Sequence, residues 1–280
     1  MEEPAEPTPR WQGGLGVAAV ILFVGTGLVG AILRIRFDPA SAHDSVQSMR
    51  GMWQFLRGWH AWLASAVLVA GILSLADAWI RNRRAARVPI AWYARVAGLG
   101  LALAAFFLGS LLPADQQAAE SWNHVEAATG TASEHVPVGG VLAAHAVLVP
   151  VAGIAWLALV AGRGWRERVA SWPTAIQRAA PTAAILAAGA ALLALAAPPE
   201  LGPRPIEGLV ASRPDWPFLW LGPFQDWFGV AAGVWAGAAT SALFLGAAPW
   251  LGAGWSARVR GLVALAAFAA MVALSWRGAA

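Results

Sequence analysis

The chain has 280 residues, of which 59% are hydrophobic and only 12% are charged. Soluble domains carry about 25% charged residues, so this composition excludes an ordinary soluble protein and predicts an all-α integral membrane protein. The formal net charge is +4, and every basic side chain except histidine is an arginine. The arginines lie in short segments between apolar runs, which favours an anionic membrane face over nucleic acid as their neighbour. Cysteine is absent, which excludes disulfides, Cys-ligated iron–sulfur clusters and thioether-linked haem within this sequence.

Uncharged runs of about 18 residues or more predict spanning helices. Seven such runs cover residues 13–33, 58–76 (beginning earlier, near Gly51), 96–114, 136–162, 179–199, 227–257 and 261–276. We expect a four-helix bundle over 13–162 and a three-helix part over 163–280. Residues 1–12 are acidic and Pro-rich, so we expect a cytoplasmic tail there rather than a cleavable signal peptide.

Loop charge predicts the orientation. Arginines gather after the second, fourth and sixth runs, whereas the 115–135 loop has acidic residues and no arginine. By the positive-inside rule, the arginine-rich loops and the N-terminus are cytoplasmic. The first loop departs from this rule, because it carries Arg34, Arg36, Arg50 and Arg57 on the outer side. The two long connections of the chain also lie on the outer side, and loops of that length are often functional.

Two histidines lie at membrane depth, where an ionisable side chain is costly and usually serves a function. His60 lies about two turns inside the second run and His145 about two turns inside the fourth. At a rise of 1.5 Å per residue, both are roughly 10 Å below the outer surface. Such a pair can ligate one haem iron axially. The alternative is two histidines bonded only to backbone carbonyls; zinc is disfavoured, since no acidic or sulfur ligand lies at that depth.

Three other residues fit a haem site. Gly27 and Gly109 lie in the outer halves of the first and third runs, where the missing side chain lets a flat ring approach the backbone. Ordinary packing of small residues is the alternative for both glycines. Arg57 lies one turn before His60 and is expected to pair with a haem propionate, or else to extend to the interface.

Five segments resemble, in the same order, cytochrome b of the quinol-oxidising bc-type complexes in its short, seven-helix, chloroplast-like form. They are GG and VGTG within 13–27, SAHDSVQSM and LRGWHAWLAS within 41–65, LGSLLPADQ at 108–116, HAVLVP at 145–150 and SRPDWPFLW at 212–220. The last is similar to the PEWY segment of the family's quinol-oxidation pocket, with Asp215 replacing Glu and Pro217 replacing Tyr. The resemblance implies a haem b between the helices of the four-helix bundle.

The sequence departs from the family where an inner haem would be. The family carries a second histidine about 14 residues after the first on each ligand helix, and four turns place it on the same face. Here those positions are Ser74 and either Leu159 or Val160, and Arg95 lies where a glycine is expected. The cysteine that holds the extra haem of the chloroplast-like form is also missing. We therefore expect one haem b per chain.

The resemblance implies a subunit of a quinol:electron-acceptor oxidoreductase in a prokaryotic plasma membrane, as a homodimer or in a multisubunit complex. Quinol would bind on the outer side, with Asp215 taking a proton and His124 and Glu126 as possible proton carriers. One electron would pass to the haem of His60 and His145. The other would pass to a Rieske-type iron–sulfur protein and on to a cytochrome c or another outer-side acceptor, without a complete Q-cycle. Two alternatives are a haem b anchor linking the quinone pool to a periplasmic oxidoreductase, and a non-redox scaffold.

Overall fold

The structure is a computed structural model that describes residues 14–81, 90–133, 135–161, 165–206, 215–248, 250 and 255–279. All regular structure in these ranges is helical, which confirms the all-α class. The elements in chain order are α1 (Gly14–Leu33), η1 (Pro39–Ser41), α2 (Ala42–Ser48), α3 (Met52–Arg81), α4 (Ile90–Leu111), α5 (Gln116–Thr129), α6 (Val138–Ala143), η2 (Ala144–Leu148), α7 (Val149–Ala161), α8 (Trp165–Ala196), η3 (Trp216–Leu221), α9 (Gly222–Phe228), α10 (Val230–Ala247) and α11 (Ala257–Ala279).

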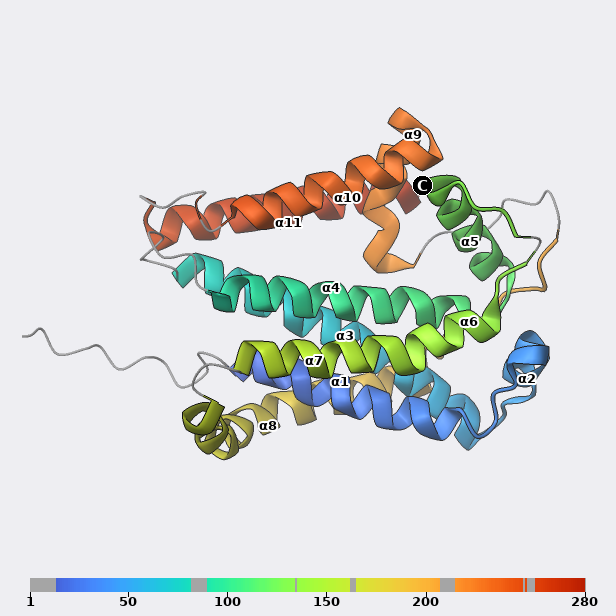
Figure 1. Cartoon of the computed structure of the whole chain (residues 1–280), viewed down its shortest axis with the longest axis horizontal. Coiled ribbons are helices and arrows are strands. Elements are labelled where there is room, and N and C mark those ends of the chain that lie inside the picture. Colours follow the sequence, from blue (N-terminus) through green and yellow to red (C-terminus); the bar gives the residue numbers. More distant parts are fainter. Residues whose placement is uncertain are drawn as a thin grey trace, which may run out of the picture.

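Seven helices among the described residues are long and apolar enough to cross a membrane, which confirms the prediction of seven spans. They cover Gly14–Leu33, Met52–Ile80, Trp92–Leu111, Val138–Ala155, Trp172–Ala196, Val230–Ala247 and Ala257–Leu274. In Figure 1 these helices run along the long axis of the molecule. The short helices α2 and α5 lie at one end, which we call the outer end.

The core of the bundle is formed where α1, α3, α4 and α8 meet. Leu68 of α3 and Ala18 of α1 are completely buried there, and Leu22 and Val67 are almost so. Small residues such as Ala179 and Ala183 of α8 let that helix approach α1 and α3 closely. This apolar core extends along α1 from Ala18 to Val29, beside the level of His60.

Aromatic N–H and O–H groups attach the C-terminal helices to the bundle at the inner end. The indoles of Trp79 and Trp92 donate to the carbonyls of Ala248 and Leu245, at 2.7 and 2.9 Å. The Tyr93 hydroxyl donates to the carbonyl of Gly246. These carbonyls belong to the last turn of α10, whose carbonyls have no partner within the helix. At the outer end, the indole of Trp235 donates to the Ala128 carbonyl of α5 at 2.8 Å.

Candidate functional site

His60 and His145 face one another in the outer half of the bundle, as the sequence predicts from their depth. His60 lies on α3 and His145 lies in η2, yet their ring centroids are 6.2 Å apart, with the ring planes at 76°. A metal bonded to one nitrogen of each ring, at about 2.0–2.1 Å, would separate the centroids by roughly 6 Å. The spacing would therefore allow both imidazoles to ligate one metal ion.

Each of these histidines uses one ring nitrogen to bond a backbone carbonyl. The Nδ1 atom of His60 lies 3.0 Å from the Thr26 carbonyl, and the Nδ1 atom of His145 lies 2.9 Å from the Ala105 carbonyl. A carbonyl only accepts, so both Nδ1 atoms carry the proton and both Nε2 atoms keep a lone pair. Neither Nε2 atom has a hydrogen-bond partner in the described part of the chain. Metal-binding histidines are oriented by the same kind of carbonyl bond.

A glycine lies against each imidazole. A Cβ atom added to Gly30 would be 2.9 Å from Cε1 of His60, and one added to Gly109 would be 3.0 Å from Cε1 of His145. Gly109 is thus in the place that the sequence predicts, although its direct contact is the histidine ring. Gly27 is different, because a Cβ atom added there would meet nothing within 4 Å. Sequence reasoning missed Gly30, whose only signal is its place one turn after Gly27.

The backbone is irregular at His145. Residues Ala144–Leu148 form a π-helical turn between α6 and α7, in which the amide of Val149 donates to the Ala144 carbonyl. A π-turn adds a residue to the helix and rotates the following side chains, and such turns are frequent at functional sites. The position of His145, the candidate ligand, therefore depends on this π-helical turn as well as on its depth along the helix.

The inner half of the bundle repeats this arrangement without histidines. A Cβ atom added to Gly16 would lie 3.1 Å from the hydroxyl oxygen of Ser74. Gly16 precedes Gly30 by 14 residues and Ser74 follows His60 by 14, so the same antiparallel register of α1 and α3 makes both contacts. The hydroxyl of Ser74 is too short to reach an iron in the bundle centre. The side chains of Leu159 and Val160 lie outside the described residues.

Arg95 lies near the inner end of α4, where the sequence predicts that it obstructs a ring. Its side chain is exposed. Apolar side chains, including Leu22, Leu68 and Ala102, pack between this level and the histidine pair. The obstruction of a second ring by Arg95 therefore stays a prediction.

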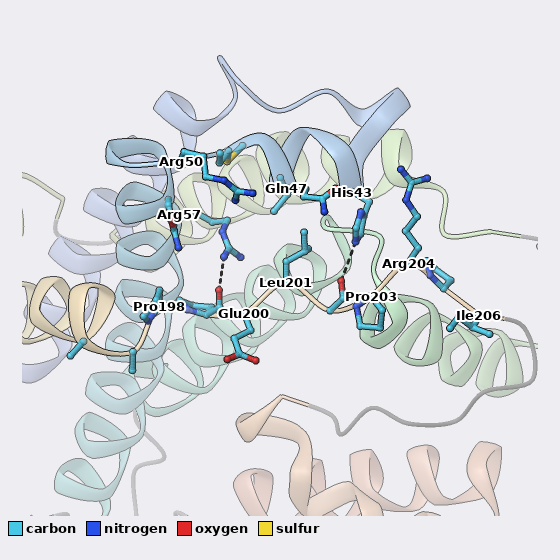
Figure 2. A pocket seen from close by; sticks show the side chains of 18 residues that line it. His43, Gln47, Arg50, Arg57, Pro198, Glu200, Leu201, Pro203, Arg204 and Ile206 are labelled. Atoms are coloured by element: carbon cyan, nitrogen blue, oxygen red, sulfur yellow. Dashed lines mark hydrogen bonds between the residues drawn. The ribbon is translucent and has the colours of Figure 1, made fainter.

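Arg57 bonds the backbone of a distant segment. Its Nη2 atom donates to the Pro199 carbonyl, just beyond the end of α8 (Figure 2). The side chain is half-buried and lines an outer cavity with Arg50 and Gln54. Its pairing with a propionate stays a prediction.

Asp215 precedes η3 and faces the junction of α4 and α5. Its carboxylate bonds the side chains of Gln117 and Ser110, and it makes no side-chain bond to the first turn of η3. Burial raises the pKa of Asp215 above the ordinary aspartate value, and the nearby charge of Asp115 adds to that rise, while the two hydrogen bonds oppose it. The structure thus places Asp215 as a half-buried carboxylate that binds protons more tightly than usual.

Aromatic rings of η3, which directly follows Asp215 in the sequence, pack against aromatic rings of α4. Phe106 and Phe107 of α4 contact Phe218 of η3, with centroids 6.3 and 5.6 Å apart. The indole of Trp216 lies 6.4 Å from Phe106 and donates to the hydroxyl of Ser65, five residues after His60. The segment that carries Asp215 therefore reaches the α3 surface within about one turn of the histidine pair.

His124 and Glu126 differ in their surroundings. The Nδ1 atom of His124 lies 3.5 Å from the amide nitrogen of Gln225 on α9, and burial lowers the pKa of His124. Glu126 accepts hydrogen bonds from the indole of Trp122 and from the amide and hydroxyl of Ser133. These bonds lower the pKa of Glu126, so it stays ionised and closes the turn after α5.

The chemistry of the donor set favours haem over a bare metal ion. Within the described residues there is no group of three or more His, Asp or Glu side chains that could hold a metal. Two histidines are insufficient for a tetrahedral zinc site. They suffice for haem iron, because the porphyrin supplies the remaining nitrogen ligands. The residues present therefore fit a bis-histidine haem.

The sequence matches no protein-family model and no curated protein. The fold, in contrast, is similar to that of a chain in the structure titled "Hyperthermophilic respiratory Complex III", with a TM-score of 0.75 and 17% sequence identity. The similarity covers 99% of this chain and 85% of that chain. At this identity the match shows the fold alone, and it extends over essentially the whole membrane domain.

Proposed function

We propose that this chain is a cytochrome b-like electron-transfer subunit that holds one haem b between His60 and His145. The observation that carries the proposal is the facing pair of imidazoles, each fixed through Nδ1 to a carbonyl and each with Nε2 left for a metal. The fold similarity to a chain of a respiratory Complex III structure supports the same conclusion. A haem bound there would supply one-electron transfer.

The protein's own residues would prepare quinol for oxidation at the outer end. Asp215 is a half-buried carboxylate with an elevated pKa, so its ionised form can accept a proton from a quinol hydroxyl. Ser110 and Gln117 hold its carboxylate in place. Phe106, Trp216 and Phe218 offer aromatic surfaces on which a quinol ring can stack.

The same proposal includes no complete Q-cycle. Ser74 offers no imidazole at the inner position, where it lies against Gly16. Electrons reaching the outer site therefore lack a second haem in this chain on the way to the inner face. We propose that they leave to outer-side acceptors, a Rieske-type iron–sulfur protein and a cytochrome c or similar carrier, in a multisubunit complex of a prokaryotic plasma membrane.

Visible spectroscopy of the purified protein tests the proposal. Reduced-minus-oxidised spectra should show a b-type haem in the wild type and none in H60A or H145A. The matched control is H135A, which removes an exposed outer-end imidazole. Equal spectra in all four proteins would contradict the assignment, and a wild type without haem would favour a non-redox scaffold. Retained haem without quinol oxidation, with partners present, would favour an anchor for another oxidoreductase.

A further inference from the structure

A basic cavity lies at the outer end, away from the histidine pair. It has a volume of about 1180 Å³ and is bounded by α2, the start of α3 and the 197–206 segment (Figure 2). Three arginines line it, Arg50, Arg57 and Arg204, against one carboxylate, Glu200. In Figure 2 the Glu200 side chain extends away from Arg50 and Arg57. Arg204 is paired with Asp44 and Arg57 lies near the Asp115 charge, so Arg50 contributes the positive charge of the cavity that no carboxylate among the described residues offsets.

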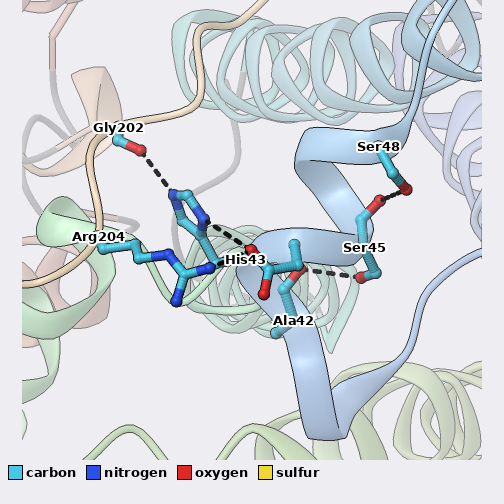
Figure 3. Close-up of polar contacts among 7 residues, drawn as sticks. Ala42, His43, Ser45, Ser48, Gly202 and Arg204 are labelled. Carbon is cyan, nitrogen blue, oxygen red and sulfur yellow. Dashed lines mark hydrogen bonds and ion pairs between the residues drawn. The ribbon is translucent and has the colours of Figure 1, made fainter.

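The wall of this cavity is held in place by long-range bonds. The 197–206 segment has no regular secondary structure, but it is bonded to three helices. His43 of α2 donates through Nε2 to the Gly202 carbonyl at 3.0 Å, and Arg204 pairs with Asp44 (Figure 3). Gln116 of α5 makes two further bonds. Its backbone amide donates to the Pro203 carbonyl at 2.9 Å, and its side-chain oxygen Oε1 accepts from the backbone amide of Ile206. The cavity is thus a built feature of the fold.

Two arginines in the cavity wall have N–H groups that can bind a ligand. The guanidinium of Arg50 is exposed and has no side-chain partner among the described residues. The guanidinium of Arg57 spends one N–H on the Pro199 carbonyl and has four more to offer. Planar guanidinium groups favour phosphate and carboxylate oxygens, which they can bind through two parallel hydrogen bonds. The cavity is therefore suited to an anionic, oxygen-rich ligand.

The position of the cavity points to lipid. The span of α3 begins at Met52 and that of α8 ends at Ala196, so the cavity lies at the level of the lipid headgroups. Met49 and Leu201 add apolar surface to its lining. The last turns of α8 also expose Leu192 and Leu195, at 67% and 68%, along which an acyl chain can lie. The cavity therefore offers arginines for a phospholipid headgroup and apolar surface for its acyl chains.

We propose that this outer cavity binds the phosphate of an anionic membrane phospholipid, with Arg50 and Arg57 as its ligands. The site also accounts for two of the four arginines of the first loop, which depart from the positive-inside rule, because Arg50 and Arg57 line this cavity. The other two are used locally, since Arg34 donates to the Phe37 carbonyl and Arg36 lies over the Trp53 ring. The proposal stands independently of the haem.

Thermal unfolding and native mass spectrometry of the delipidated full chain test this proposal, with phosphatidylglycerol, phosphatidylcholine and inorganic phosphate as probes. Phosphatidylglycerol should raise the melting temperature of the wild type and be retained in a one-to-one complex, and phosphatidylcholine should do neither. R50E should weaken that retention by about tenfold or more, and R50K by less. The control is R36Q, which removes a positive charge from the same end but not from the cavity.

Two outcomes would overturn the proposal. If R50E and R36Q retain phosphatidylglycerol as the wild type does, the lipid binds elsewhere on the surface. If inorganic phosphate reproduces the stabilisation, the ligand is a soluble anion. Both readouts are independent of haem, so they separate failure of this proposal from failure of the electron-transfer function.

Discussion

Ser74 lies against Gly16 in the register in which His60 lies against Gly30. A Cβ atom at Gly16 would be 3.1 Å from the Ser74 hydroxyl, and one at Gly30 would be 2.9 Å from the His60 ring. The α1–α3 pair thus contains two equivalent positions, 14 residues or about four turns apart. The outer position carries an imidazole and the inner position does not. This relationship underlies the proposal of a single haem.

Adding a methyl group at Gly30 or Gly109 should disturb the ligand at each position. The new Cβ atom in G30A or G109A would crowd the imidazole, and overpacking of this kind costs about 1–3 kcal/mol. The ring must then move away from its carbonyl partner, so the haem retained per polypeptide should fall. Haem content after purification measures this effect.

Gly25 provides the control for these variants, because a Cβ atom there would meet nothing within 4 Å. G25A should keep the wild-type haem content. G27A is a separate test of the sequence prediction: it should lower haem content only if the flat ring lies against Gly27. Unchanged haem in G30A and G109A would contradict the assignment of His60 and His145 as ligands.

Asp215 should control the pH dependence of quinol oxidation. The carboxylate must be ionised to accept a proton, and its pKa is raised by burial, so the rate should increase as pH rises through that elevated pKa. D215N should lose roughly 100-fold or more in rate and should also lose this limb of the profile. D215E should retain part of the rate and part of this pH dependence. A D215N profile like that of the wild type would contradict the role.

The same pKa shift predicts an effect on stability. Between the ordinary aspartate pKa and the raised one, the folded state holds the Asp215 proton more firmly than the unfolded state does. The free energy of unfolding should therefore fall as pH increases across that interval and should level off above it. D215N should lack this pH dependence. The melting temperatures of D215N and the wild type should therefore change differently as the pH rises from acidic to neutral. Parallel curves would contradict the burial of the carboxylate.

Asp115 should stabilise the outer end. One carboxylate oxygen accepts from the Ala118 amide and so caps α5, and the other accepts from the Gly202 amide, both at 3.0 Å. D115A removes both bonds from a buried site and should destabilise the protein by about 1–3 kcal/mol. Asp38, which caps the exposed η1, is the control: D38A should have a smaller effect in the same thermal melt. Equal effects would show that the bond to Gly202 adds nothing.

The sequence predicts the spanning helices and the histidine pair because both depend only on the residues of one segment. Twenty apolar residues are enough to define a spanning helix, and counting turns is enough to place His60 and His145 at one depth. The rotation of a helix about its own axis is harder to predict from the sequence. A shift of three residues, from Gly27 to Gly30, changes the face of α1 that is predicted to line the site by about 60°. The π-turn at His145 also leaves no mark in the hydrophobic pattern.

The outer end could not be predicted in the same way. Its geometry depends on bonds between residues far apart in the sequence, such as Arg57 with Pro199 and Asp115 with Gly202. Periodicity and loop charge carry no information about such pairs. The sequence predicts that Arg57 lies on the face of His60, but it carries no sign of the bond to Pro199 or of the outer cavity that Arg57 lines.

The number of haem groups per polypeptide shows whether His60 and His145 hold a single haem. A pyridine haemochrome assay, divided by the polypeptide concentration from amino-acid analysis, gives the number of b haems per chain. The arrangement of His60, His145 and Ser74 predicts a value of one, and H60A should reduce it to zero. Two b haems per polypeptide, or one that persists in H60A, would contradict the account.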